Sequence, residues 1–204
     1  MTLQRPTPRL ILASASVSRR ALLRAAGLNF EVKPAQVDEA VVKHAARSDG
    51  QSAEQAALCL AELKARHVAR QEPGALVIGA DQILVCDDIW FDKPVSIAAA
   101  REQLLALRGR SHILATAVLC ARGDEGLWHH IDQPRLTMRQ FSDAFLDAYL
   151  AAEGASVTST VGAYQLEGRG IHLFDRVEGD HSAILGLPLL PLLAFLRQSG
   201  VLPS

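Results

Sequence analysis

The sequence predicts an α/β fold built around a mixed β-sheet. Apolar stretches of strand length alternate with helical stretches through the first half of the chain, which is typical of strands joined by helical crossovers. In the second half, two strand-like stretches flank the turn "RGDEG" and indicate a hairpin, which adds antiparallel strands. The chain has 204 residues, 49% of them hydrophobic, so it can bury the core of one domain or of one domain with two lobes.

The helices are predicted from the signals at their ends. Ser52 and Gln55 form a capping box, while Ser96 and Ser142 precede two later helices and can cap their free N–H groups. Gly27 is a suitable stop for the first helix, and Pro188 lies near the start of the last one. The predicted helices span residues 17–26, 53–70, 97–107, 143–153 and 188–200.

The strands are predicted from apolar or alternating stretches that are bounded by glycine, proline and polar residues. They are expected within residues 9–13, 30–40, 75–88, 112–121, 127–140 and 170–179. The second of these strands runs into a loop that carries Asp38 and Glu39. The third is nearly apolar except at Asp81 and Gln82, which makes both residues candidates for a functional site.

The composition argues against several classes of protein. A formal net charge of −1 is unlike a general nucleic-acid binder, which usually shows an excess or a stripe of basic residues. Cys59, Cys86 and Cys120 are far apart and odd in number, so we expect small buried side chains in a reducing cytosol and no disulfide framework or zinc site. No signal peptide or membrane-spanning stretch is visible, so we expect a soluble cytoplasmic protein without a membrane partner.

A run of hydroxyl and guanidinium groups joins the first strand to the first helix. In "SASVSRR", Ser14 and Ser16 can donate hydrogen bonds, and Arg19 can bind an anion through two N–H groups. The helix N-terminus adds free N–H groups and a partial positive charge, so this stretch can bind phosphate. The alternative is that Ser16 only caps the helix while Arg19 and Arg20 point into water.

Asp81 lies inside an apolar strand, where a carboxylate is unfavourable unless it has a partner. That partner can be a metal ion, a lysine or a water molecule, and Gly79 leaves room for its close approach. The alternative is an aspartate at the end of a strand, bonded to a neighbouring loop. Asp38 and Glu39 can hold Mg²⁺ together with substrate phosphates and water, although a solvated acidic loop explains them equally well.

Lys64 and Lys93 carry positive charge in two different settings. Lys64 lies in the alanine-rich helix, and Lys93 is followed by proline in the motif "DKP". On its own, each is most simply a surface lysine. The seven histidines show no metal-binding spacing, so no role is assigned to them.

Taken together and in order, these motifs resemble the Maf family of nucleoside triphosphate pyrophosphatases, once named septum-formation inhibitors. The resemblance covers nearly the whole chain. It rests on "LILASAS", "VDE", "LAELKA", "VIGADQ", "DKP" and "LRGRSH", and on the long block "VGAYQLEGRGIHLFDRVEGDHSAILGLPL". It implies that residues 1–204 form a single Maf/ITPase-like domain, with an elongated mixed sheet, flanking helices and two lobes around a cleft.

The resemblance also implies an activity, a cofactor and an assembly. Members of the family hydrolyse a nucleoside triphosphate to the monophosphate and pyrophosphate with a divalent cation, Mg²⁺ or Mn²⁺, and commonly form homodimers. Asp81 matches the family's general base, and Glu39 and Asp81 match its cation ligands. The residues that match its phosphate-binding positions are Ser14, Arg19, Lys64 and Lys93.

Three further positions are implied to select the base, namely Ser18, Gln82 and Glu167. The subgroup that prefers dTTP or UTP has Arg, Thr and Gln there, and the 7-methyl-GTP subgroup has Trp, Gln and Glu. This chain therefore shares two of the three with the 7-methyl-GTP type, although Ser18 matches neither. The Glu167 carboxylate can accept hydrogen bonds from the N1–H and N2–H₂ groups of guanine. The alternative for Glu167 is a salt bridge to Arg169 or Arg176.

The leading interpretation is a pyrophosphatase that prefers guanine-like or modified nucleotides such as 7-methyl-GTP. One alternative is a pyrophosphatase of the same family that prefers pyrimidine triphosphates. Another is a non-catalytic regulator of septum formation that binds nucleotide or a division partner. Asp81 argues against the regulator, because a protein that only binds a triphosphate has no need of a buried carboxylate beside it.

Overall fold

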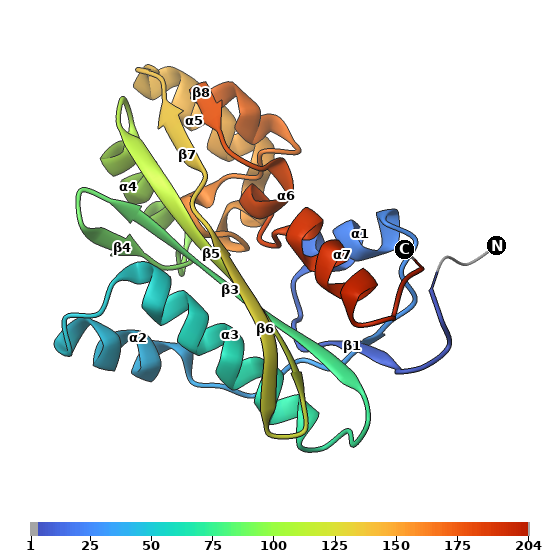
Figure 1. The fold of residues 1–204 in the computed structure, drawn as a ribbon. Coiled ribbons are helices and arrows are strands. Elements are labelled where there is room, and N and C mark those ends of the chain that lie inside the picture. The colour runs from blue at the N-terminus through green and yellow to red at the C-terminus, as the bar shows by residue number, and fades with distance from the viewer. Residues whose placement is uncertain (1–3, 204) are drawn as a thin grey trace. The chain divides into compact units, whose positions relative to one another are not determined.

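The computed structural model describes residues 4–203 and confirms a mixed α/β fold (Figure 1). The strands are β1 (Leu10–Leu12), β2 (Glu31–Val32), β3 (Leu76–Cys86), β4 (Ile89–Phe91), β5 (Ser111–Arg122), β6 (Glu125–Asp132), β7 (Arg135–Met138) and β8 (Phe174–Glu178). The α-helices are α1 (Val17–Ala25), α2 (Glu39–Ser48), α3 (Ala53–Ala69), α4 (Ile97–Leu107), α5 (Asp143–Glu153), α6 (His181–Ile184) and α7 (Leu189–Gln198). The short 3₁₀ helices are η1 (Gly154–Thr158), η2 (Val161–Ala163) and η3 (Arg169–Leu173).

The strands form one sheet of mixed direction. Its main path runs in the order β2–β1–β3–β5–β7–β8, while β4 pairs with β3 and β6 pairs with β5. β1 is parallel to both β2 and β3, and Ile11 lies opposite Val77 in the second of these pairs. The pairs β3–β4, β5–β6, β5–β7 and β7–β8 are antiparallel, so the predicted hairpin is present in the second half of the chain.

The described chain divides into two compact units, each with its own hydrophobic core. Unit 1 contains residues 4–82, 116–132 and 185–203, and unit 2 contains residues 83–115 and 133–184. The long strands β3 and β5 contribute residues to both units, because the division falls within each of them.

In unit 1, helices cover both faces of the sheet (Figure 1). On one face, Ile78 of β3 packs in a cluster with Leu23 of α1 and Leu196 of α7, all of them fully buried. On the opposite face, α3 packs so closely on β3 that a Cβ atom added at Gly79 would lie 2.1 Å from the carbonyl oxygen of Ala61. Only glycine allows this contact, and the close approach brings α3 side chains to the strand that carries Asp81.

The core of unit 2 is formed by α4, α5, the 3₁₀ helices and the strand residues between them. It includes Leu104 of α4, Leu114 of β5 and Leu146 of α5, which are at most 1% exposed. Two tyrosines, Tyr149 and Tyr164, belong to the same cluster and bring hydroxyl groups into it. Because buried hydroxyl groups need hydrogen-bond partners, each tyrosine requires a partner at a fixed position in the core of unit 2.

The prediction that Asp38 and Glu39 lie in a loop holds for Asp38, the last residue before α2, and is wrong for Glu39. Asp38 is the N-cap of α2, where its carboxylate accepts a hydrogen bond from Val41 N at 3.2 Å, and Glu39 is the first residue of the helix. Acidic side chains are favourable at this end of a helix because they complement its partial positive charge. The motif "VDEA" therefore marks a helix start that fixes the backbone of Glu39.

Two predicted strands are shorter than the sequence indicates. The stretch 127–140 is divided into β6 and β7 at Pro134, which has no N–H group to donate to the sheet. Both strands nevertheless pair with β5. The stretch 170–179 becomes a strand only at Phe174, because residues 169–173 form η3.

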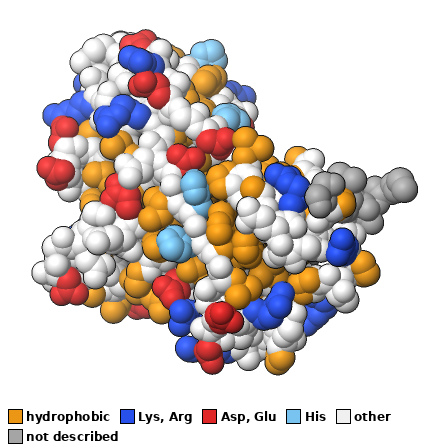
Figure 2. Space-filling view, in the orientation of Figure 1, with side chains coloured by type: hydrophobic (Ala, Val, Ile, Leu, Met, Phe, Trp, Pro, Cys, Tyr) orange, Lys and Arg blue, Asp and Glu red, His pale blue; other side chains and the backbone are white. Residues whose placement is uncertain are grey.

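The surface of the described chain carries charges of both signs. Figure 2 shows acidic and basic side chains interspersed on one face, with apolar side chains between them. Some of the charges are paired, such as Arg9 with Glu31 at 2.8 Å and Arg70 with Asp124 at 2.5 Å. Among the helices of residues 4–203, none combines the length and the apolar composition needed to cross a bilayer.

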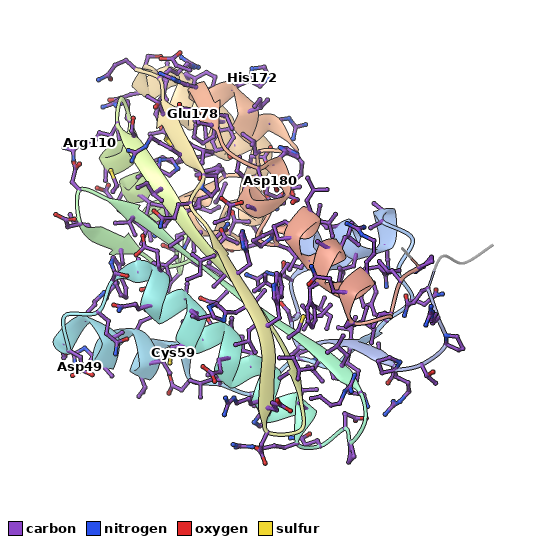
Figure 3. All side chains as sticks on the ribbon, in the orientation of Figure 1. Asp49, Cys59, Arg110, His172, Glu178 and Asp180 are labelled. Carbon is purple, nitrogen blue, oxygen red and sulfur yellow. The ribbon has the colours of Figure 1, made fainter. Side chains whose placement is uncertain are left out.

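Two of the three cysteines are buried as predicted, and one is not. Cys86 and Cys120 lie in β3 and β5, whereas the Cys59 thiol is exposed on α3 (Figure 3). Burial raises the pKa of Cys120 far above its ordinary value. The expectation of small buried side chains therefore holds for the two strand cysteines and is wrong for Cys59, which lies on the outer surface of an amphipathic helix.

Candidate active site

The start of α1 is fixed by two serine hydroxyls. Ser16 caps the helix by accepting a hydrogen bond from Arg19 N at 3.3 Å. The Ser14 hydroxyl accepts a hydrogen bond from Ser16 N at 3.2 Å. These contacts hold the first turn of α1 directly after β1, so its backbone N–H groups are in a position to bind an anion.

Arg19 points into unit 1 and not into water, since only 8% of the residue is exposed. Its guanidinium donates three hydrogen bonds, to Gly186 O at 2.7 Å, Ala80 O at 2.9 Å and Ser14 Oγ at 3.1 Å. Burial lowers the pKa of Arg19, while the negative charges of Asp81 and Glu39 raise it. The alternative of a solvated Arg19 is therefore wrong, and its charge lies within reach of two carboxylates.

The partner of Asp81 is a lysine. Side chains alternate along β3, so Asp81 faces the same side as Gly79, toward α3. Lys64 of α3 places Nζ 2.5 Å from Asp81 Oδ1. Asp81 is 4% exposed and Lys64 is 7% exposed. Because an unpaired buried charge is strongly unfavourable, this ion pair explains how a nearly apolar strand accommodates a carboxylate.

Lys64 also binds Glu39, with Nζ 2.6 Å from Oε1. Glu39 reaches the lysine from the first turn of α2, and its side chain is 47% exposed. One ammonium group therefore joins a buried carboxylate on the sheet to a second carboxylate that is open to solvent. The surface reading of Lys64 is wrong, because its charged end is enclosed by this acidic pair.

One oxygen of Asp81 remains available. Oδ2 is buried and makes no hydrogen bond with any of the described residues. Buried carboxylate oxygens are normally satisfied, so Oδ2 marks a place for a water molecule, a cation or a substrate group. Carboxylate oxygens suit Mg²⁺ and Mn²⁺, and Mg²⁺ often binds one or two carboxylates together with substrate phosphates and water. Glu39 and Asp81 fit that requirement. Residues 4–203 contain no larger cluster, of three or more His, Cys, Asp or Glu side chains, that could hold a metal.

Two of the residues implied in base selection also belong to unit 1. Gln82 follows Asp81 on β3, and its Nε2 donates a hydrogen bond to Thr116 Oγ1 at 2.8 Å. Thr116 is fully buried on β5, so the orientation of the Gln82 amide is fixed from the neighbouring strand. Ser18 is the second residue of α1 and is half-buried.

Lys93 belongs to unit 2, where it follows β4 and is exposed. The backbone beside it is held by Gln103 of α4, whose Nε2 donates a hydrogen bond to Asp92 O at 2.7 Å. Within unit 2, the structure thus shows a lysine on an anchored segment, and its contact with phosphate stays a prediction.

Glu167 also belongs to unit 2 and is exposed between η2 and η3. The two arginines considered as its partners form other ion pairs, Arg169 with Glu153 at 3.2 Å and Arg176 with Glu178 at 2.8 Å. Because an arginine can contact more than one carboxylate, a salt bridge of Glu167 to Arg169 or Arg176 stays an alternative. Its role in base selection stays a prediction.

Two backbone carbonyls that hold Arg19 are not indicated by the sequence. Ala80 contributes one from β3, and Gly186 contributes the other from the segment before α7. Gly186 lies 167 residues after Arg19, so only the folded chain brings them together. A glycine ahead of a proline-capped helix is the local signal at this position, and it does not specify an arginine as the neighbour.

The chain matches the family model described as Maf-like protein over residues 9–199. The nucleoside triphosphate pyrophosphatase of Granulibacter bethesdensis is 54% identical over 194 residues, which cover 95% of this chain and 98% of that protein. The nucleoside triphosphate pyrophosphatase of Rhodospirillum rubrum is 53% identical and covers 97% of this chain. The 7-methyl-GTP pyrophosphatase of Rhizobium meliloti is 48% identical over 97% of this chain and 99% of that protein.

Among solved structures, lipoprotein GNA1162 from Neisseria meningitidis aligns with 75% of this chain at 17% identity and a TM-score of 0.28, which carries no argument about the fold. The family model and the relatives, by contrast, extend over nearly the whole chain, and residues 9–199 of the family match include every motif quoted from the sequence. They confirm the resemblance that those motifs indicated. The chain therefore belongs to the Maf-like protein family.

Proposed function

We propose that this chain hydrolyses a nucleoside triphosphate to the monophosphate and pyrophosphate at the cluster formed by Asp81, Lys64, Glu39 and Arg19. The observation that carries the proposal is the buried Asp81 carboxylate, which is held at Oδ1 by Lys64 and is without a partner at Oδ2 among the described residues. Membership of the family and the pyrophosphatase names of relatives that are 54% and 53% identical support the same reaction.

Asp81 is the proposed general base. Its Oδ2 can orient a water molecule and accept a proton from it as the water attacks phosphorus. Lys64 fixes the rotation of the carboxylate by binding the other oxygen, so the accepting oxygen keeps one direction. A positioned general base typically contributes about 10²- to 10⁴-fold to the rate.

Positive charge comes from Arg19, Lys64 and the N-terminus of α1. In phosphoryl transfer, charge spreads over the phosphoryl oxygens, and catalysis is mainly positioning and electrostatic stabilisation. The Arg19 guanidinium is already held by hydrogen bonds on three acceptors, so little reorganisation is needed when substrate binds. Ser14 and Lys93 are proposed to contribute a hydroxyl group and a further positive charge to phosphate binding.

A divalent cation is proposed to accompany the substrate. The charges of Arg19 and Lys64 are formally cancelled by those of Asp81 and Glu39, so a triphosphate alone would meet repulsion as well as attraction. Glu39 and Asp81 would hold Mg²⁺ or Mn²⁺. When bound, the ion offsets phosphate charge and stabilises the pyrophosphate leaving group.

A guanine-like or modified base, with 7-methyl-GTP as the leading candidate, is the proposed preference. It is supported by the chemistry of Glu167, a carboxylate that accepts from the N–H groups of guanine and faces a carbonyl on uracil or thymine. The names of the relatives from Rhizobium meliloti and Mesorhizobium japonicum, 48% and 47% identical, give further support. Gln82 adds an oriented amide on β3.

A homodimer in the cytoplasm is proposed from the family resemblance. Light scattering on the purified protein tests the assembly. A mass equal to two chains of 22.0 kDa is expected, and a mass equal to one chain at micromolar concentration would contradict the dimer.

The test of the proposed activity is a panel of triphosphates. Purified protein is mixed with 7-methyl-GTP, GTP, dTTP or UTP in the presence of Mg²⁺, Mn²⁺ or a chelator, and pyrophosphate and single phosphate are measured separately. Pyrophosphate is expected from the metal-containing reactions, with 7-methyl-GTP turned over fastest. Faster turnover of dTTP and UTP would favour the pyrimidine alternative. No turnover of any of these nucleotides would overturn the proposed pyrophosphatase activity.

A further inference from the structure

A buried hydrogen bond in unit 2 takes no part in the reaction proposed above. It joins His112 of β5 to Tyr164, with His112 Nε2 2.7 Å from the tyrosine hydroxyl. His112 is 1% exposed and Tyr164 is 6% exposed. Tyr164 comes three residues before Glu167, so this bond lies at the base of the segment that carries the proposed base-selecting carboxylate.

His112 is an unfavourable choice for packing alone. Its Nδ1 is buried and makes no hydrogen bond within residues 4–203. The rings of Tyr164 and Phe174 lie 5.6 Å and 5.9 Å from its own ring. Burial lowers the pKa of His112 to about 4, so the ring is neutral near pH 7. An apolar side chain would avoid the unsatisfied nitrogen, so the bond to Tyr164 is the contact that only a polar residue supplies.

The backbone next to Tyr164 is held in a strained conformation. Ala163 has φ +59°, in the left-handed region that side chains other than glycine seldom adopt. The Tyr149 hydroxyl donates a hydrogen bond to Ala163 O at 3.1 Å, and Thr160 Oγ1 donates one to Tyr164 O at 2.8 Å. Strained backbone of this kind persists only where its surroundings fix it, and it is concentrated at functional sites.

The same segment continues into the turn that carries Glu167. Gly168 N donates a hydrogen bond to Gln165 O at 3.1 Å and closes the turn. Gly170 packs so tightly on this turn that a Cβ atom there would lie 2.4 Å from Gln165 O. The backbone on both sides of Glu167 is therefore fixed, although the Glu167 side chain itself is exposed.

We infer that His112 and Tyr164 are positioning residues for base selection, because their hydrogen bond holds the turn that presents Glu167 to the base. The inference rests on the proposed function, in which Glu167 selects the base. A carboxylate held in one orientation leaves a wrong base with unpaired polar groups, whereas a loosely held carboxylate can turn away from it. Selectivity between bases then depends on the hydrogen bond between His112 and Tyr164, although neither residue is proposed to contact the base or the phosphates.

The experiment compares kcat/KM for 7-methyl-GTP and UTP in variants of the full chain. Tyr164→Phe removes only the hydroxyl, His112→Leu removes both ring nitrogens, and His112→Gln keeps a polar group near the position of Nε2. The selectivity ratio is expected to fall about tenfold in the first two variants and to recover in His112→Gln, because only the last can remake the bond. The double variant Tyr164→Phe, His112→Leu is expected to be no less selective than either single one, since both changes break one bond.

A matched control separates positioning from general destabilisation. Thr137→Val also deletes a hydroxyl in unit 2, one that lies 2.7 Å from Ser111 Oγ, and it is expected to leave the ratio unchanged. In Tyr164→Phe, kcat for pyrophosphate release from 7-methyl-GTP is expected to stay within about threefold of wild type, because the cluster around Asp81 is intact.

Glu167→Gln separates the failure of this inference from the failure of the proposed function. An unchanged ratio in Glu167→Gln would overturn base selection by Glu167 and this inference with it. A changed ratio in Glu167→Gln together with an unchanged ratio in Tyr164→Phe would overturn only the positioning role. Equal losses on both nucleotides in Tyr164→Phe would also overturn it, because a merely structural role lowers activity without changing selectivity.

Discussion

Lys64 and Asp81 form a buried ion pair that uses only one of the two carboxylate oxygens. Nζ lies 2.5 Å from Oδ1, while Oδ2 is buried without a hydrogen-bond partner in the described part of the chain. Lys64 also contacts Glu39 at 2.6 Å, so β3, α3 and the start of α2 meet at one ammonium group. A carboxylate that is fixed on one side and available on the other suits a general base.

Asp81→Asn is expected to remove most of the turnover and to keep the fold. The asparagine side chain cannot accept a proton from water, so kcat should fall about 10²- to 10⁴-fold. Pyrophosphate release measures the rate, and circular dichroism checks the fold. Asp124→Asn is the matched control, because that carboxylate is exposed and pairs with Arg70; it should leave kcat unchanged. Wild-type turnover by Asp81→Asn would exclude the general-base role.

Lys64→Met is expected to destabilise the protein strongly. Removing one partner of a buried ion pair leaves an uncompensated charge, which costs about 3–5 kcal/mol in the free energy of unfolding. Urea denaturation measures this loss. In the Lys64→Met background, Asp81→Asn should recover part of it, because the buried negative charge is then gone.

Arg70→Met is the control for Lys64→Met, since it removes a cation from an exposed pair, and its effect should be below about 1 kcal/mol. Two results would show that Lys64 is not the main partner of Asp81. One is an equal free energy of unfolding for Lys64→Met and Arg70→Met, and the other is a further loss of stability when Asp81→Asn is added to Lys64→Met.

Glu39→Gln is expected to weaken the binding of the divalent cation without unfolding the protein. Its side chain is half-exposed, so its removal leaves little buried charge, but it takes away one of the two proposed cation ligands. The Mg²⁺ concentration for half-maximal turnover should rise on the order of tenfold. Glu62→Gln, on the surface of α3 and paired with Arg66, is the control and should not change that concentration. Identical Mg²⁺ titrations for Glu39→Gln and wild type would argue against Glu39 as a ligand.

The stability of the protein is expected to fall in acid because of His112. Burial lowers its pKa from the ordinary 6.5 to about 4 in the folded chain, so the unfolded chain binds the proton more readily. The free energy of unfolding is therefore unaffected by this group above pH 6.5, and it falls by about 3 kcal/mol as the pH decreases toward 4.

His112→Gln tests this dependence because glutamine does not titrate. Urea denaturation at a series of pH values gives the free energy of unfolding of both proteins. The advantage of wild type over the variant should shrink as the pH falls from 6.5 to 4. A difference that stays constant over this range would show that the His112 pKa is the same in the folded and unfolded chains.

Local signals in the sequence were sufficient to predict much of the fold. Ser16, Ser52, Ser96 and Ser142 each cap the helix that follows them, because capping depends on a few neighbouring residues. The start of α2 could not be separated from an acidic loop, since Asp38 and Glu39 are common in both settings. The break at Pro134 also has a local cause, but its exact effect depends on pairing with β5.

The site was harder to predict, because its contacts join distant segments. A buried carboxylate at Asp81 requires a partner, but the sequence alone did not distinguish between a lysine, a metal ion and a water molecule as that partner. The choice of Lys64 follows from the close packing of α3 on Gly79, which is a tertiary contact. The inward direction of Arg19 likewise depends on Gly186, which is far away along the chain.

The most direct measurement is product analysis for wild type and Asp81→Asn side by side, with 7-methyl-GTP and Mg²⁺. Wild type is expected to produce monophosphate and pyrophosphate in equal amounts, and the variant almost none of either. Diphosphate and single phosphate as the products, or equal rates from the two proteins, would contradict this expectation.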